Sequence, residues 1–208
     1  MSARDRIFSR IKAAREHSGV AYAPQRDALE TVGEDFENPV RQFVELAKEN
    51  DATVEELTSG DLIEDAIREY LDRADYQGAV MFGDGLHQLS AQPGFAAASS
   101  ATLVNDGMAY ADTAYAGLAE AGAIVTLSPA EGKPEYAFLA RIHIAVLSKS
   151  LILRDMETLW TRLRKDSPGQ MPRAINVIVG PSRTADLGVP AKLGAHGPSA
   201  VHILLVDE

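Results

Sequence analysis

Two mostly apolar runs near the C-terminal end constrain the fold of this chain most strongly. The first run is Ile175–Val179 and the second is Val201–Val206. Runs of this length are typical of strands that are buried on both faces of a sheet. A polar loop, Gly180–Asp186, follows the first run, and another, Gly194–Pro198, precedes the second. Open α/β sheets usually build their sites at strand ends, so we expect a site at these two loops.

Helical and strand patterns alternate along the rest of the chain. Capping residues predict the starts of three helices: Asn38 followed by Pro39, then Ser59 or Asp61, then Asp155. Short apolar runs predict strands at 53–54, 77–82, 102–104, 136–140 and 142–147. The segment 115–127 predicts a hairpin that turns at Ala121-Gly122, with a helix over 111–121 as the alternative. The alternation predicts an α/β fold, a three-layer sandwich with a mixed, largely parallel sheet.

Length and charge predict how the chain is organised. Its 208 residues suffice for one large α/β domain, which we place at 27–208 after an N-terminal helical arm and linker at 1–26. The arm carries six basic and two acidic residues, whereas 27–75 carries 16 acidic and four basic residues. Ile7, Phe8 and Ile11 form an apolar stripe on the helix expected at Ser2–Glu16. Such a stripe can pack against another subunit, so a homo-oligomer through the arm is a possible assembly.

Composition also argues against several classes of protein. The net charge of −10, without clusters of basic and aromatic residues, argues against nucleic-acid binding. No apolar run approaches the roughly 20 residues of a membrane span, and no secretory signal pattern is visible, so we expect a cytoplasmic protein. The chain has no cysteine and therefore cannot ligate an iron-sulfur cluster through its own sulfurs. Metal-ligand spacings and the Gly-x-Ser-x-Gly motif of hydrolases are also absent from the sequence.

The two C-terminal loops carry the candidate ligand-binding residues. Arg183 offers a planar fork of donors for a carboxylate or phosphate, and Ser182 and Thr184 add hydroxyl donors, which together favour an anion as ligand. Asp186 can hold Arg183 in place or fix the tautomer of His196. The candidate set is Gly180, Ser182, Arg183, Thr184, Asp186, Gly194, His196 and Gly197. The alternatives are a capped turn with Arg183 in solvent and an ordinary glycine-containing loop around His196.

Two residues outside these loops, Glu120 and His143, are weaker candidates. Glu120, at the hairpin turn, can act as a general base if burial raises its pKa, and His196 is the other candidate acid-base group. His143 and His202 lie within apolar strand patterns, where a structural histidine is the more common occurrence. Of the two, only His143 remains a possible site residue.

Four segments resemble the lactate utilization protein C family, whose members share the LUD domain. They are Gly180–Asp186, Leu193–Pro198 with Val201–Asp207 after it, Ile142–Val146 and Leu118–Gly122. The resemblance covers roughly the C-terminal half of the chain, in the same order. One departure is the turn Glu120-Ala-Gly122, where the family usually has Glu-Thr-Gly.

The resemblance implies both a fold and a function. The expected fold is similar to that of ribose-5-phosphate isomerase, CoA transferases and the folate cyclo-ligase group. The expected role is that of a non-redox component, beside two iron-sulfur partner proteins, in oxidising lactate to pyruvate. On this hypothesis the chain itself binds no cofactor and either holds a small anionic metabolite or organises its partners. Two alternatives stay open: a stand-alone enzyme acting on a phosphate, CoA or nucleotide substrate, and an interaction scaffold.

Overall fold

The structure is a computed structural model of the whole chain. It describes residues 3–17, 37–83, 85–95, 107–128, 136–169, 171–184, 192–193 and 197–207. The chain divides into two compact units, Met1–Val32 and Gly33–Glu208.

The described part of the first unit, residues 3–17, is the helix α1 (Ala3–His17), which confirms the helix expected in the arm. The side chains of residues 3–14 are exposed. Ile7, Phe8 and Ile11 are each more than half exposed, although they form the apolar stripe of the helix. None of the described helices, α1 included, is long and apolar enough to cross a membrane.

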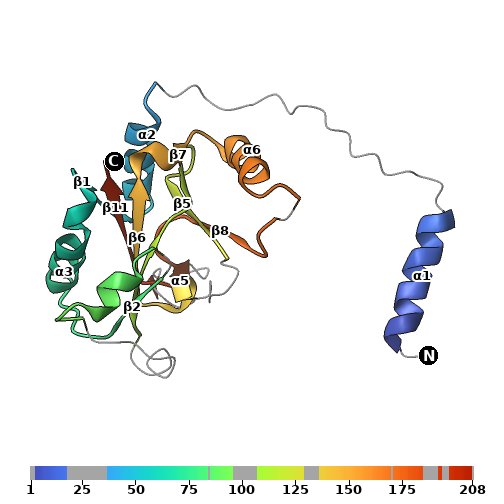
Figure 1. Cartoon of the computed structure of the whole chain (residues 1–208), viewed down its shortest axis with the longest axis horizontal. Helices are drawn as coiled ribbons and strands as arrows, with labels where there is room; N and C mark the ends of the chain where they lie inside the picture. Colours follow the sequence, from blue (N-terminus) through green and yellow to red (C-terminus); the bar gives the residue numbers. More distant parts are fainter. Residues whose placement is uncertain are drawn as a thin grey trace. The chain divides into compact units, whose positions relative to one another are not determined.

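A five-stranded sheet forms the centre of the second unit (Figure 1). Its strands, in spatial order, are β1 (Thr53–Leu57), β11 (Ala200–Val206), β6 (Ile142–Ser148), β3 (Ala109–Thr113) and β2 (Val80–Phe82). Every neighbouring pair is parallel. The central strands β6 and β11 are buried along almost their whole length, as their continuous apolar runs predict. The expected α/β fold with a mostly parallel sheet is therefore confirmed.

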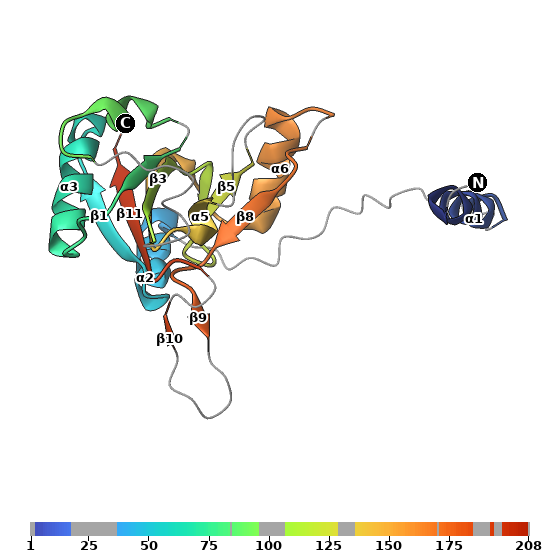
Figure 2. The same ribbon diagram turned by 90° about the horizontal axis from the view of Figure 1, so that it is seen from below.

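A second sheet of four strands is mixed, with one parallel pair and two antiparallel pairs. Its strands, in spatial order, are β7 (Ile152–Leu153), β4 (Ala116–Leu118), β5 (Ala123–Leu127) and β8 (Ile175–Ile178). Strands β4 and β5 form the hairpin that the sequence predicts, so the helical alternative over 111–121 is wrong. A small ribbon of β9 (Arg183–Thr184) and β10 (Lys192–Leu193) follows β8 in the chain (Figure 2).

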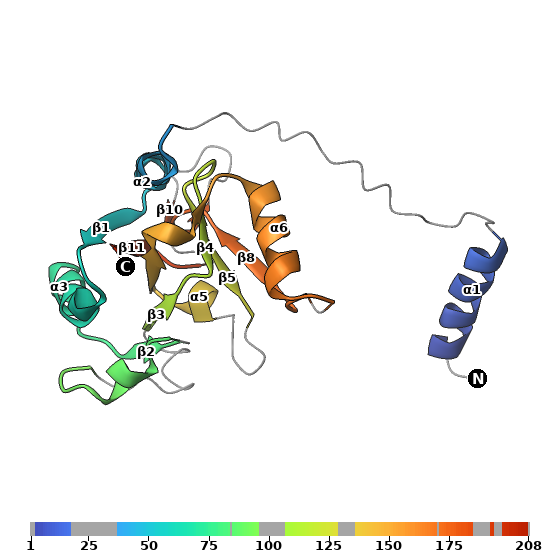
Figure 3. The ribbon, with the colours of Figure 1, turned by 45° about the horizontal axis from the view of Figure 1, so that its top comes forward.

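Helices cover both sheets (Figure 3). Helix α3 (Ile63–Arg73) packs on one face of the parallel sheet, after the short helix η1 (Gly60–Leu62). On the other face, α2 (Pro39–Glu49) and the second sheet share one core with β6 and β11. Helix α6 (Met156–Asp166) covers the far side of the hairpin. The other short helices in the described part of the chain are η2 (His87–Ala91), α5 (Tyr136–Leu139) and η3 (Lys149–Leu151).

Side-chain caps begin the helices largely as expected. The Asn38 side chain accepts a hydrogen bond from the backbone N–H of Arg41, and the Asp155 side chain accepts one from Thr158. Ser59 caps η1, and the chain continues from there into α3. These caps satisfy donors that have no partner inside the helix.

Two predicted strands differ from the structure. Segment 136–140, predicted as a strand, forms α5 instead, because a helical turn buries Ala137 and Ala140 while leaving Phe138 and Leu139 exposed. Short apolar runs do not distinguish a strand from a buried helical turn. Within the strand predicted at 77–82, only Val80–Phe82 forms a strand, β2. The strand predicted at 102–104 lies outside the described residues.

Gly122 permits a close approach between the hairpin and α2, and we predict that Gly122→Ala destabilises the protein. Its φ is +59°, and an added Cβ would lie 2.3 Å from the backbone nitrogen of Ala47. The matched control is Gly169→Ala, where φ is +80° but nothing lies within 4 Å of the added atom. We expect a loss of about 1–2 kcal/mol in unfolding free energy for the control, from backbone strain alone. Crowding of the α2 backbone should add about 1–3 kcal/mol at residue 122. Urea denaturation measures both, and equal losses would show that the hairpin can move away from α2.

Candidate functional site

The two C-terminal loops lie against each other at the start of β11. The backbone N–H of Ser182 donates a hydrogen bond to the Pro198 carbonyl, with a nitrogen to oxygen distance of 2.8 Å. A Cβ added to Gly197 would lie 3.0 Å from the Ser182 Cβ. The structure thus brings together Ser182 and Gly197, one predicted site residue from each loop.

Gly180 packs tightly against the turn that ends α2. Its φ is +66°, and an added Cβ would lie only 2.0 Å from the Asn50 carbonyl oxygen. The side-chain amide of Asn50 also donates a hydrogen bond to the carbonyl of Ala121 in the hairpin turn, at 3.1 Å. This turn therefore contacts both the hairpin and the loop that carries Arg183.

Arg183 lies in β9 and forms an ion pair with Asp51. Its side chain stays 49% exposed, and a guanidinium has more donors than one carboxylate can use. Asp51 follows directly after the Asn50 turn and has a φ of +62°. The partner seen for Arg183 is thus a residue from the other end of the domain.

Several predicted site residues lie outside the described part of the chain. Asp186, Gly194 and His196 are among them, and for Thr184 only the backbone, in β9, is described. Their place in an anion site stays a prediction.

Glu120 caps a helix in the structure. Its carboxylate accepts a hydrogen bond of 2.8 Å from the backbone N–H of Met156, the first residue of α6. Glu120 is exposed. The burial that our interpretation as a general base required is therefore missing, and stabilisation of the α6 N-terminus accounts for this carboxylate.

His143 forms a buried pair with Asp112 from the neighbouring strand. The Nε2 atom of His143 lies 2.9 Å from Asp112 Oδ1, and no part of the His143 side chain is exposed. The Tyr110 ring stacks on the imidazole with 5.8 Å between ring centroids. Among the described residues the Nδ1 atom of His143 has no hydrogen-bond partner. An ionised Asp112 can only accept a hydrogen bond, so its contact with Nε2 requires a proton on that nitrogen of His143.

Removing the Asp112 carboxylate should leave a buried imidazole N–H without an acceptor. We expect Asp112→Ala to lower the free energy of unfolding by about 1–3 kcal/mol. Asp112→Asn keeps an oxygen that can accept from Nε2 and should lose clearly less. Urea denaturation of both variants checks this, and equal stability of the two would mean that the hydrogen bond contributes little.

A cavity that sequence reasoning missed lies at the carboxyl ends of the parallel strands. It has a volume of about 420 Å³, and we call it the carboxyl-edge pocket. Its lining comes from the ends of β1, β3, β6 and β11 and from η1, and it includes Thr58, Ser59, Thr113, Ser148 and Asp207. Lys149 bridges the rim through ion pairs to Glu56 at 2.6 Å and to Asp207 at 3.0 Å. This is the edge at which open α/β sheets commonly bind ligands.

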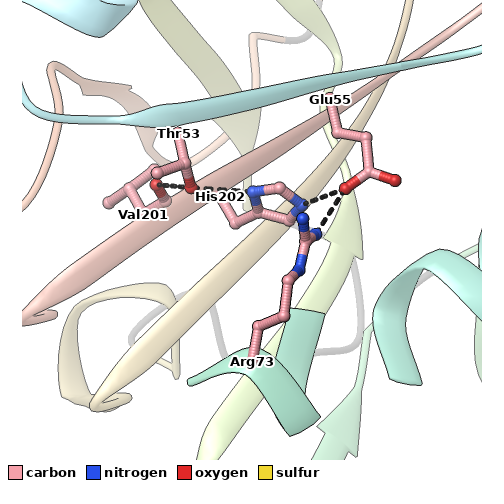
Figure 4. Close-up of polar contacts among 5 residues, drawn as sticks. All are labelled: Thr53, Glu55, Arg73, Val201 and His202. Carbon is pink, nitrogen blue, oxygen red and sulfur yellow. Dashed lines mark hydrogen bonds and ion pairs between the residues drawn. The ribbon is translucent and has the colours of Figure 1, made fainter. Parts of the chain in front are cut away.

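A second cavity, of about 490 Å³, lies beside β1 and α3, and we call it the β1–α3 pocket. His202 of β11 lines it and is almost completely buried (Figure 4). Its Nδ1 atom lies 2.8 Å from the Thr53 hydroxyl, and its ring stacks on Tyr70 with 3.8 Å between centroids. Burial lowers the pKa of His202 from 6.5 to about 4, so the imidazole is neutral at pH 7.

The lowered pKa makes stability depend on pH between the two values. In that window the unfolded chain takes up a proton at residue 202 and the folded chain does not, so stability falls as the pH falls from about 6.5 towards 4. Between pH 7 and pH 5 this contribution amounts to about 2 kcal/mol. We expect His202→Gln to lose that part of the pH dependence, and the exposed His87→Gln to keep it. Urea denaturation at both pH values checks this, and identical slopes for wild type and His202→Gln would contradict it.

No group of three or more His, Asp or Glu side chains within the described ranges is placed to hold a metal ion.

Comparison with known proteins identifies the family of this chain. The sequence profile of the LUD domain matches residues 34–206, and the chain belongs to this family. The match covers both C-terminal loops as well as the strands that form the two pockets.

Relatives align over about half of the chain. Uncharacterized protein YkgG of Escherichia coli (strain K12) is 35% identical over 112 residues, covering 52% of this chain and 47% of that protein. Lactate utilization protein C of Geobacillus kaustophilus (strain HTA426) is 32% identical over 111 residues, covering 52% and 45%. Lactate utilization protein C of Bacillus subtilis (strain 168) is 33% identical over 93 residues, covering 43% and 39%. The chain thus spans about half the length of the curated relatives it matches.

One solved structure shares the fold. The crystal structure of a DUF162 family protein from Deinococcus radiodurans superimposes with a TM-score of 0.56 at 17% identity. The superposition covers 81% of this chain and 96% of that protein. The expected similarity to ribose-5-phosphate isomerase and CoA transferases stays a prediction.

Proposed function

We propose that this chain is a non-redox component of a cytoplasmic lactate utilization system, in which iron-sulfur proteins oxidise lactate to pyruvate. The observation that carries the proposal is the family match together with several relatives named lactate utilization protein C. The sequence contains no cysteine, so electron transfer through a cysteine-ligated cluster must occur on a partner. On this view the chain contributes binding and positioning.

The C-terminal loops are the proposed contact for a small anion or for a partner carboxylate. Arg183 supports this role because it is held by Asp51 on one side while half of its side chain stays exposed. A guanidinium has donors for two partners in different directions. The Ser182–Pro198 hydrogen bond holds the neighbouring loop in register with it.

An enzyme acting on a small molecule is the second candidate. The carboxyl-edge pocket favours it, because its volume of about 420 Å³ falls within the range of ligand sites and it carries several hydroxyl groups. Ligand-dependent thermal stabilisation separates this candidate from the first. A phosphate, CoA or nucleotide ligand at a hundredfold excess over its Kd should stabilise the protein by about 2.7 kcal/mol.

Deleting the gene for this chain in its own organism should abolish growth on lactate while leaving growth on glucose intact. Complementation with Arg183→Ala should restore growth poorly, since the exposed donors at the C-terminal loops are lost. Arg41→Ala is the matched control, because Arg41 is also exposed and ion-paired, to Glu45, but lies on α2. Growth rates on the two carbon sources measure the outcome. Normal growth of the deletion strain on lactate would contradict the proposal.

A tagged version of the chain should recover iron-sulfur proteins from cells grown on lactate. Iron and acid-labile sulfide in the purified complex measure this directly. Recovery of the chain without iron and without acid-labile sulfide would contradict the proposed partnership with iron-sulfur proteins.

A further inference from the structure

The β1–α3 pocket shares no residue with the C-terminal loops and plays no part in the proposed function. Three of its polar side chains come from different elements: Glu55 from β1, Arg73 from α3 and His202 from β11 (Figure 4). The first two form an ion pair, with 2.7 Å between the Arg73 guanidinium and Glu55 Oε2. Their side chains remain 62% and 28% exposed, so both can contact a ligand as well as each other.

The opposite charges of this pair select the chemistry of the ligand. A ligand that carries only negative charge would meet the Glu55 carboxylate, and one that carries only positive charge would meet Arg73. A ligand with a carboxylate beside a hydrogen-bond donor complements both groups. Its carboxylate can accept from the guanidinium, and its donor can face Glu55.

His202 adds a donor that lacks a partner. Its ring is neutral and therefore carries a proton on one nitrogen only. The Thr53 hydroxyl lies 2.8 Å from Nδ1 and 3.4 Å from the Val201 carbonyl, and its single proton can go to only one of them. Since the Nδ1 contact is the shorter and the Glu55 carboxylate faces Nε2, we place the ring proton on Nε2. Nε2 and Glu55 Oε2 are 3.7 Å apart, too far for a hydrogen bond, and Nε2 has no other partner among the described residues. Buried donors are nearly always hydrogen-bonded, so this N–H favours a ligand with an oxygen that can accept from it.

We propose that the β1–α3 pocket binds a small carboxylic acid that carries a hydroxyl or an ammonium group on the carbon next to the carboxylate. The ligand carboxylate accepts hydrogen bonds from Arg73 and from His202 Nε2, and the neighbouring hydroxyl or ammonium donates to Glu55. Because His202 Nε2 is buried and lies 3.7 Å from Glu55 Oε2, the ligand reaches it by displacing part of the contact between Glu55 and Arg73. The volume of about 490 Å³ leaves room for a side chain on the same carbon.

Calorimetric titration of the full chain with three acids of similar size tests the proposal. L-lactate carries the hydroxyl, L-alanine the ammonium, and propionate neither. We expect lactate or alanine to bind at least about tenfold more tightly than propionate, and the stronger of the two identifies which donor the pocket takes. Equal binding of all three, or no heat with any of them at 100 mM, would overturn the proposal.

Two substitutions locate the binding in this pocket. Glu55→Gln should raise the Kd for the preferred acid about tenfold and reduce its preference over propionate, because the acceptor for the donor group loses its charge. Arg73→Gln should weaken all three acids. Arg41→Gln, which breaks the exposed Arg41–Glu45 pair on α2, is the control and should bind as wild type does. Unchanged binding in both pocket variants would overturn the assignment. The outcome is independent of growth on lactate, which tests the proposed function separately.

Discussion

The parallel pairing of β11 with both β1 and β6 is the interaction on which the rest of the structure depends. Residues 200–206, at the end of the chain, insert between a strand near the start of the domain and one from its middle. The five-stranded sheet is therefore incomplete until this last strand is in place. One face of β11 contributes to the core under α2, and the other contributes to the core under α3. The same strand brings His202 beside Thr53 and positions the loop at Pro198 against Ser182.

The turn after α2 is a second junction, because two distant segments, the hairpin turn and the loop that carries Arg183, contact it. The side-chain amide of Asn50 contacts Ala121 in the hairpin turn, and the backbone carbonyl of Asn50 lies against Gly180. Asp51 pairs with Arg183. The loop that carries Arg183 is thereby held by the N-terminal part of the domain. This arrangement explains how the Arg183 side chain can be held by an ion pair and still be half exposed.

Local sequence signals predicted the parts of the fold that local physics determines. Caps such as Asn38 and Asp155 marked helix starts, because they supply hydrogen bonds within one turn of the chain. The apolar runs of β6 and β11 marked buried central strands. The strand predicted at 136–140 was wrong because a short apolar run fits either a strand or a helical turn. Only the elements that pack against such a run determine which of the two forms.

The sites depended on contacts that the sequence could not reveal. Asp51 was not predicted as the partner of Arg183, since more than a hundred positions separate them and Asp186 lies closer in the chain. His202 was interpreted as a structural histidine because it lies within an apolar strand. Its pairing with Thr53 and its distance from Glu55 follow from the register between β1 and β11. The carboxyl-edge pocket likewise arises from four strand ends that meet only in the folded sheet.

The protonation state of His202 tests most directly whether β11 places an unsatisfied donor beside β1. Nitrogen chemical shifts of histidine-labelled protein at pH 7 distinguish the two neutral tautomers from the charged ring. Our account predicts a neutral ring with its proton on Nε2. A proton on Nδ1, or a charged ring at this pH, would contradict it.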